Sequence, residues 1–174
     1  MIPSEVSGGQ QQRVGIARAL SLNPKLVVCD EPISALDVSV QVQIIELLQD
    51  LQNEMGLSYL FISHNLGVVQ YLSDSIMVLY LGEVVEHSTA EDLFHSPAHP
   101  YTQMLVNSIL KVPTTLAAKR PLVSVANETA SPVSSSVGCP FYYRCPVAID
   151  RCSLEKPQLR EIAANHLASC HLVD

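Results

Sequence analysis

The sequence contains no long apolar run and few basic residues, and each shortage excludes a class of protein. No run of apolar residues approaches the roughly 18 that a membrane-spanning helix needs, and the amino terminus carries no basic-then-apolar export signal. Ten lysines and arginines stand against seventeen aspartates and glutamates, which gives a net charge of −7. Because nucleic acids and anionic membrane surfaces attract basic proteins, we expect neither as the main partner.

A glycine followed by lysine is also missing. None of the seven glycines has lysine as its next residue. The common phosphate cradle, the P-loop, needs Gly-Lys-Ser or Gly-Lys-Thr, because its backbone amides and its lysine surround the phosphates. The sequence therefore provides no P-loop, and by itself it should hardly bind ATP.

The composition fits one globular core. The 174 residues are 48% hydrophobic, enough for one core and a small appendage. Five cysteines without an export signal point to reduced thiols or metal ligands in a cytosolic chain, rather than to disulfides.

Strand-like apolar runs alternate with helical stripes along the first half of the chain. The expected order is helix 10–22, strand 26–30, helix 38–55, strand 59–62, helix 66–72 and strands 76–80 and 83–86. Strands that alternate with helices predict an α/β fold of the doubly wound kind. Two short helices, 90–94 and 101–110, should follow, and the proline and serine content predicts a linker over 112–138.

The apolar run Leu26–Asp30 ends in two adjacent acids, Asp30 and Glu31. Open α/β sheets bind ligands at the carboxyl edge of their strands. One carboxylate there can hold a magnesium ion, and the next can take up a water for attack on a phosphate. The alternative is a strand that ends in a solvated acidic turn.

Two other segments could bind or act on a phosphate, and each also has an ordinary structural explanation. Ser7, Gly8 and Gly9 precede a helical stripe, and free N–H groups at a helix N-terminus favour anions. The alternative is a flexible helix cap. His64 follows the predicted strand 59–62, where it could act on a phosphate or be a simple hydrogen-bonded histidine.

Four segments, in order, resemble an ATP-binding-cassette (ABC) ATPase. They match its signature, Walker B, D-loop and switch-histidine segments: Ser7-Gly8-Gly9-Gln10-Gln11-Gln12-Arg13, Asp30-Glu31-Pro32, Ser34-Ala35-Leu36-Asp37 and Ser63-His64. The resemblance implies the C-terminal part of a P-loop NTPase (RecA-like) nucleotide-binding domain, with a parallel sheet flanked by helices and a short cysteine-containing C-terminal extension. It also implies that the first half of the cassette, with the P-loop, is absent.

The same resemblance assigns roles at the strand edge. Asp30 would hold Mg²⁺ through water, Glu31 would polarise the attacking water and His64 would contact the terminal phosphate. ATP and Mg²⁺ are the implied cofactors. Asn65 departs from the family, which usually has an acid after this histidine.

The signature and D-loop residues would act on a neighbouring subunit, because cassette ATPases resemble one another in working as head-to-tail pairs. The residues expected at the opposite subunit's nucleotide or at the dimer seam are Ser7, Gly8, Gly9, Gln10 and Asp37.

A later segment points to one branch of the family. Asp92-Leu93-Phe94 followed by His99-Pro100-Tyr101-Thr102 resembles the extension of peptide and nickel importer ATPases. The implied function is ATP hydrolysis that drives uptake of oligopeptides or dipeptides, or of nickel. The implied partners are a second ABC ATPase subunit, as homodimer or heterodimer, transmembrane permease subunits and, indirectly, a substrate-binding protein, with the chain peripheral on the cytoplasmic face of the membrane. The alternative for these few residues is an ordinary amphipathic hairpin.

Four of the five cysteines lie close together near the C-terminus: Cys139, Cys145, Cys152 and Cys170. Their spacing is wider than in zinc fingers and differs from ferredoxin runs, yet four converging thiolates could hold iron–sulfur or zinc. The segment also resembles the tail of oligopeptide-importer ATPases, some of which carry a four-iron cluster. Iron–sulfur, zinc and unligated thiols all stay open, with His166 and His171 as spare, otherwise solvated, ligands.

The expected organisation is an ABC ATPase part over 1–87, a helical extension over 88–111, the linker 112–138 and a cysteine-rich region over 139–174. Without a P-loop, this chain alone should be inactive, and catalysis belongs to the full-length ATPase. The alternative function is a non-catalytic partner, or a metal- or redox-sensing module, that completes only one site of a cassette dimer.

Overall fold

The computed structural model describes residues 7–109 and 137–173. The chain divides into two compact units, Met1–Leu72 and Ser73–Asp174. The predicted boundary at residue 87 differs from this division. Residues 112–136 of the predicted linker lie outside the described residues. In the described part of the chain, every helix is too short or too polar to cross a bilayer.

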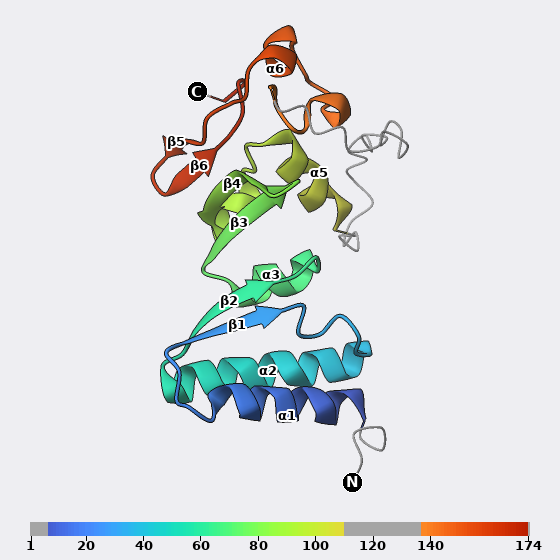
Figure 1. The fold of residues 1–174 in the computed structure, drawn as a ribbon, viewed down its shortest axis with the longest axis vertical. Helices are drawn as coiled ribbons and strands as arrows, with labels where there is room; N and C mark the ends of the chain where they lie inside the picture. The colour runs from blue at the N-terminus through green and yellow to red at the C-terminus, as the bar shows by residue number, and fades with distance from the viewer. Residues whose placement is uncertain (1–6, 110–136, 174) are drawn as a thin grey trace, which may run out of the picture. The chain divides into compact units, whose positions relative to one another are not determined.

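The first unit alternates helices and strands (Figure 1). Its elements are α1 (Gly8–Leu20), β1 (Leu26–Asp30), α2 (Val38–Met55), β2 (Ser58–Ile62) and α3 (Leu66–Leu72). β1 and β2 are parallel, with Val28 opposite Leu60. α1 and α2 run side by side (Figure 1). The helices and strands predicted for this part are confirmed to within two residues at each end.

Local sequence explains where α2 begins and ends. Asp37 caps its N-terminus, since its Oδ1 accepts a hydrogen bond of 3.0 Å from the Val40 amide. Gly56 ends the helix with φ = +63°, a left-handed conformation that glycine adopts without a Cβ clash. Between these ends, α2 contributes three buried residues to a core that also holds Tyr59 and Phe61 of β2: Ile44, Ile45 and Leu48.

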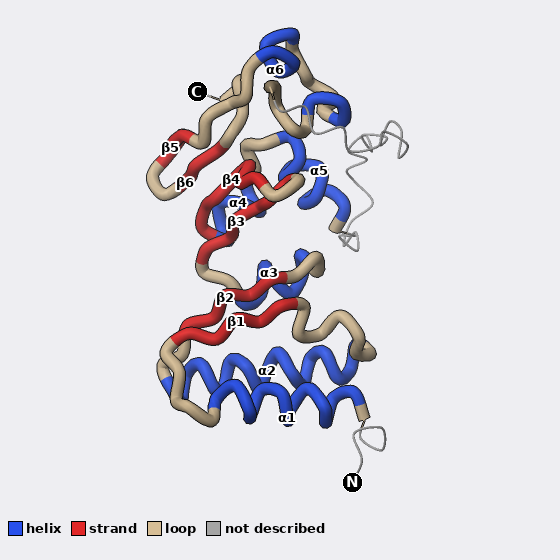
Figure 2. The backbone as a smooth tube through the Cα atoms, viewed as in Figure 1, coloured by secondary structure: helices blue, strands red, loops and turns tan. Residues whose placement is uncertain are grey.

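The second unit contains a four-stranded antiparallel sheet of order β3-β4-β6-β5 (Figure 2). Its elements are β3 (Ser75–Tyr80), β4 (Glu83–Thr89), α4 (Ala90–His95), α5 (Pro100–Ser108), the 3₁₀ turn η2 (Tyr142–Arg144), α6 (Asp150–Leu154), β5 (Arg160–Ala163) and β6 (His166–Ala168). The last four were not predicted, because runs of three to five residues show no clear periodicity. Here the sheet is antiparallel, so the doubly wound pattern describes the first unit only.

The core of the second unit is aromatic and partly charged. Phe141, 1% exposed, meets the rings of Tyr80, Tyr101 and His99 at centroid distances of 5.1, 5.4 and 5.7 Å. Beside them lies the carboxylate of Glu86, which is completely buried.

Three groups hold that carboxylate. The amides of Ala98 and His99 donate to its two oxygens at 2.8 Å each, and Nε2 of His166 lies 2.7 Å from Oε1. The expectation that His166 is a solvated, spare metal ligand is therefore wrong. β6 pairs with β4, and this pairing brings His166 to the buried carboxylate of Glu86.

Candidate functional site

The chain leaves β1 through a left-handed residue at the predicted catalytic position. The Glu31 amide continues the strand ladder by donating to the Ile62 carbonyl at 2.9 Å, and Glu31 then has φ = +45°. The Ser34 amide donates back to the Glu31 carbonyl, which closes a turn. A non-glycine residue in this conformation is uncommon and is often found at functional sites. The turn leaves the Glu31 side chain exposed beyond the end of the strand.

Glu31 and His64 are in direct contact. His64 Nδ1 lies 2.7 Å from Glu31 Oε1, and the two side chains are 75% and 44% exposed. The hydrogen bond from His64 is the main reason that the pKa of Glu31 lies below its usual range. Glu31 is therefore a carboxylate at neutral pH, with oxygen lone pairs left for a water molecule. Asp30, the preceding residue, is exposed at the same strand end.

Asn65, the departure from the family pattern, has a local structural role. Its Oδ1 accepts a hydrogen bond of 3.3 Å from the Val68 amide at the start of α3. Asparagine caps helices as well as aspartate does, so the replacement keeps the element that follows His64 in place.

Ser7 and Gln10 form a reciprocal cap at the start of α1. The Ser7 Oγ accepts from the Gln10 amide at 3.4 Å, and the Gln10 Oε1 accepts from the Ser7 amide at 3.0 Å. The predicted helix N-terminus is thus confirmed, and the Gln10 side chain, expected at a nucleotide, is bound to the cap.

The two glycines of this segment lie against the turn and the helix that follow β1. A Cβ added at Gly9 would lie 2.6 Å from Cγ1 of Val40, and one at Gly8 would lie 3.1 Å from Leu36. The α1 N-terminus therefore packs close to the start of α2, near Asp37. The Ser39 hydroxyl donates to Asp37 at 2.6 Å and lowers the pKa of that carboxyl. Packing is a reason for these glycines that the sequence alone did not reveal.

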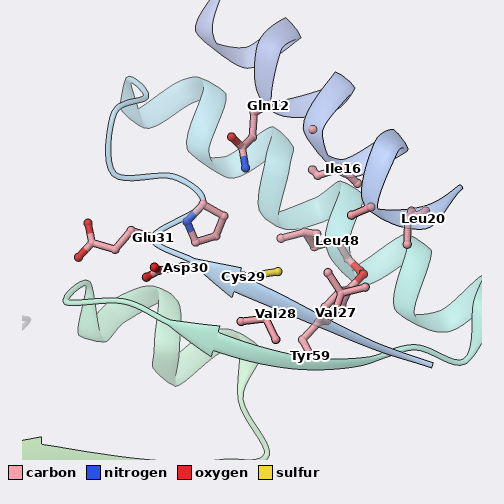
Figure 3. A pocket seen from close by; sticks show the side chains of 13 residues that line it. Gln12, Ile16, Leu20, Val27, Val28, Cys29, Asp30, Glu31, Leu48 and Tyr59 are labelled. Carbon is pink, nitrogen blue, oxygen red and sulfur yellow. The ribbon is translucent and has the colours of Figure 1, made fainter. Parts of the chain in front are cut away.

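A cavity of about 230 Å³ lies between α1 and β1 (Figure 3). Figure 3 shows Ile16, Leu20 and Leu48 on one side of the strand and Glu31 extending beyond its end. Burial raises the pKa of Cys29, which lines the cavity from β1. This thiol is therefore protonated at neutral pH. The cavity could not be predicted from the sequence, because the residues that line it come from separate elements.

The four C-terminal cysteines gather in one part of the second unit. The Cys139 amide donates to the Cys152 carbonyl at 2.8 Å. Burial first, and then the other thiols nearby, raise the pKa of Cys139, Cys145 and Cys170. Even so, in residues 7–109 and 137–173 no three cysteine, histidine or acidic side chains are arranged to hold a metal ion. His171 is hydrogen-bonded to the Glu155 carbonyl. The placement of the described thiols therefore gives no support to an iron–sulfur cluster or zinc.

Protein-family models match two parts of the chain. Residues 1–34 match the ABC transporter family, and residues 85–152 match the C-terminal region of oligopeptide/dipeptide transporters. Part of the structure also matches a solved ATP-binding cassette of an ABC transporter in its ADP conformation. That match has 28% identity and a TM-score of 0.50, and it covers 60% of this chain and 41% of the other.

Curated relatives are similar along nearly the whole chain. The oligopeptide transport ATP-binding protein AppF of Bacillus subtilis is 48% identical over 98% of this chain and 52% of its own length. The protein OppF of Salmonella typhimurium, of the same description, is 48% identical over 99% of this chain and 51% of its own. The chain thus spans about half the length of these relatives. It is similar to the ABC transporter ATPases, and oligopeptide transport ATP-binding proteins are among its relatives.

Proposed function

We propose that this chain is part of the ATP-binding and ATP-hydrolysing subunit of an importer for oligopeptides or dipeptides. The observation that carries the proposal is the contact of 2.7 Å between Glu31 and His64 at the end of a parallel strand. The lowered pKa keeps Glu31 ionised, so its oxygens can accept a hydrogen bond from an attacking water, and the histidine fixes the orientation of the carboxylate. The similarity of residues 85–152 to oligopeptide/dipeptide transporters supports peptides over nickel as the cargo.

Magnesium and ATP are the proposed cofactors. Exposed carboxylate oxygens suit a hard cation, and Asp30 at the strand end would hold Mg²⁺ through water. Bound Mg²⁺ would neutralise part of the negative charge of the phosphates. Glu31 would orient and deprotonate the water, and His64 would hold the Glu31 carboxylate and face the terminal phosphate.

The active assembly needs more than these residues. We propose a second ATPase subunit, identical or related, whose nucleotide would contact Ser7, Gly8 and Gly9, with Asp37 at the seam. Membrane permease subunits would bind the ATPase pair at the cytoplasmic face of the membrane, and a substrate-binding protein would act through them. Because the sequence has no Gly-Lys pair, this chain alone is expected to be inactive.

A four-iron cluster at Cys139, Cys145, Cys152 and Cys170 stays a prediction. The gathering of the thiols favours it, and the lack of a metal-binding arrangement among the described residues opposes it. The function proposed here does not depend on it. A non-catalytic module built on these thiols is the second candidate, and the gathering of the four thiols favours it.

Mutation of Glu31 tests the proposed function. In a cassette completed with the unmatched part of AppF, Glu31→Gln should abolish ATP turnover but preserve ATP binding, because the amide cannot take the proton. Glu46→Gln is the control, since Glu46 is an exposed carboxylate on α2 of the same unit. Turnover retained in Glu31→Gln would remove Glu31 from the role of base. Absence of turnover in the unchanged completed cassette would favour the non-catalytic module.

A further inference from the structure

Gln41 reaches from α2 to the turn that begins at Glu31. Its Nε2 donates to the carbonyl of Ile33 at 3.1 Å and to the carbonyl of Leu36 at 3.0 Å. An amide nitrogen carries two hydrogens, and the two carbonyls take one each. Both bonds are partly buried, which shields them from competing water. Gln41 therefore fastens the turn to the helix at two points.

The turn needs such a restraint because Glu31 begins it in a strained conformation. A residue other than glycine at φ = +45° costs free energy, and it persists only where neighbouring groups hold it. The amide hydrogen bonds within the turn are long. The Ser34 amide lies 3.3 Å from the Glu31 carbonyl, and the Leu36 amide lies 3.2 Å from that of Ile33. The shorter bonds from Gln41 add what these bonds lack.

The two carbonyls that Gln41 holds lie near the two ends of the segment after β1. Ile33 is two residues beyond Glu31, and its side chain is 2% exposed in the core. Leu36 precedes Asp37, the N-cap of α2, and a Cβ added at Gly8 would lie 3.1 Å from its Cδ2. One side chain of α2 therefore fixes the segment on both sides, between the carboxylate proposed as the base and the start of the helix.

We propose that Gln41 is a positioning residue: by holding the carbonyls of Ile33 and Leu36, it keeps the Glu31 carboxylate against His64. It acts through Glu31 and not on the reacting atoms. The proposal rests on the proposed function, since it concerns the geometry of the residue assigned there as the base.

The chemistry of the contact explains why the residue is glutamine. Asparagine is one methylene shorter than Gln41 and would not reach both carbonyls. Glutamate has the same shape but no hydrogen to donate, and its charge would lie against two carbonyl oxygens. Gln41→Glu therefore removes the contact without changing the volume of the side chain.

The helix itself gives no reason for Gln41→Glu to be harmful. Glutamine and glutamate have similar helix propensities, and a carboxylate near a helix N-terminus is favoured by the helix dipole. Gln41→Met is a second variant, which removes the donors without adding a charge. The matched control is Gln43→Glu on the same helix, because Gln43 is exposed and glutamate keeps the oxygen that accepts a bond of 3.4 Å from Arg13.

The first measurement uses this chain without nucleotide. Nuclear Overhauser effects between the His64 ring and the Glu31 side chain report their contact, and hydrogen exchange at the Leu36 amide reports opening of the turn. Both Gln41 variants should weaken the contact and speed the exchange by about tenfold or more, because two hydrogen bonds to the turn are lost. Gln43→Glu should leave the exchange rate within about twofold of the unchanged chain.

The second measurement is ATP turnover in the cassette completed with the unmatched part of AppF. The kcat of both Gln41 variants should fall by about tenfold or more, because a small displacement of the base slows the chemical step. The KM for ATP should stay within about twofold, since the contact to the nucleotide is not changed. A merely structural glutamine would lower the unfolding midpoint but leave the kcat of the folded protein unchanged. Circular dichroism checks that every variant is folded under the assay conditions.

The outcomes separate this proposal from the proposed function. An unchanged contact between Glu31 and His64 in both Gln41 variants would overturn the positioning role, and so would a kcat equal to that of Gln43→Glu. Absence of turnover in the unchanged cassette would instead contradict the proposed function. Loss of the contact in the Gln41 variants would even then support the positioning of Glu31 by Gln41.

Discussion

The two units each contain a glutamate–histidine pair with the same 2.7 Å contact, in opposite surroundings. In the first unit, Glu31 and His64 are 44% and 75% exposed at the end of a strand. In the second, Glu86 and His166 are 0% and 7% exposed between two strands. The first carboxylate has room for further ligands, whereas protein groups enclose the second. The second pair holds a fold together, whereas the first is proposed to act in a reaction, and the two pairs differ in solvent access.

The second pair connects parts of the chain that are far apart in sequence. Glu86 accepts hydrogen bonds from the turn before α5 and from His166 of β6, which lies 80 residues further along. The family match ends at residue 152, before β5 and β6. Because β6 completes both the sheet and the Glu86 site, the last strands are an integral part of the second unit.

The largest predicted effect is at Glu86. Glu86→Ala leaves His166 and two amides without their buried partner, so the second unit should lose about 3–5 kcal/mol of unfolding free energy. Denaturant unfolding followed by tyrosine fluorescence measures it. The control is Glu83→Ala on the same strand, which removes an exposed contact with Lys156 and should cost less than about 1 kcal/mol. Similar losses for both variants would show that burial does not distinguish the two carboxylates.

The next effect is the pH dependence set by His99. Burial lowers the pKa of this 1% exposed histidine to about 4, although the charge of Glu86 acts against the shift. Between about pH 6.5 and 4 the unfolded chain binds a proton here that the folded unit does not. The contribution of His99 to the unfolding free energy is therefore complete above pH 6.5 and is lost as the pH falls toward 4. The total loss is about 3 kcal/mol.

His99→Asn checks this contribution, because asparagine can still accept the hydrogen bond that His99 Nδ1 accepts from the Tyr101 amide, yet it does not titrate. Unfolding free energies of both proteins are compared from pH 7 to 4. The difference between them should shrink toward low pH. A constant difference across the range would contradict a neutral, buried His99.

A smaller effect is expected at Gly138. A Cβ there would lie 2.6 Å from the Cys152 carbonyl oxygen and 2.7 Å from that of Ser153, and backbone cannot move aside cheaply. Gly138→Ala should therefore cost about 1–3 kcal/mol of unfolding free energy in the second unit. Gly15→Ala on α1, where nothing lies within 4 Å, should instead stabilise the first unit by about 0.5–1 kcal/mol. Thermal unfolding should show a lower unfolding temperature for Gly138→Ala and a higher one for Gly15→Ala. Stabilisation by Gly138→Ala would show that the backbone is not packed closely there.

The smallest effect on stability is expected at Glu31. Its contact with His64 is in solvent, where exposed pairs contribute little. Glu31→Gln should leave the unfolding midpoint of the chain unchanged in the assay used for Glu86. A clear loss of stability would mean that the exposed pair also holds the first unit together.

The first unit could be predicted from sequence because its signals are local. The stripe of Ile44, Leu48 and their neighbours fixes α2, and short motifs mark Ser7, Glu31 and His64 within one or two residues of an element end. The roles of Glu31 and His64 were implied by the family resemblance, and the structure brings them together because the two strands that they follow are parallel neighbours.

The second unit was harder to predict from sequence, because the contacts that hold it together join residues that are far apart in the chain. Glu86 looks like any polar residue of a strand, and three residues of β6 carry no periodic pattern. One signal was available: a glutamate between Val85 and His87 in an otherwise half-buried strand must find a partner if the strand becomes central. Which partner it finds depends on pairing across 80 residues, and spacing alone does not predict that.

The most direct test measures turnover and stability together in the completed cassette. Glu31→Gln should abolish ATP hydrolysis at an unchanged unfolding midpoint, and Glu86→Gln should lower the midpoint while the folded fraction still hydrolyses ATP. That result would establish that the two glutamate–histidine pairs divide catalysis and stability between them. Loss of hydrolysis by the fully folded Glu86 variant, or full hydrolysis by the Glu31 variant, would contradict the account.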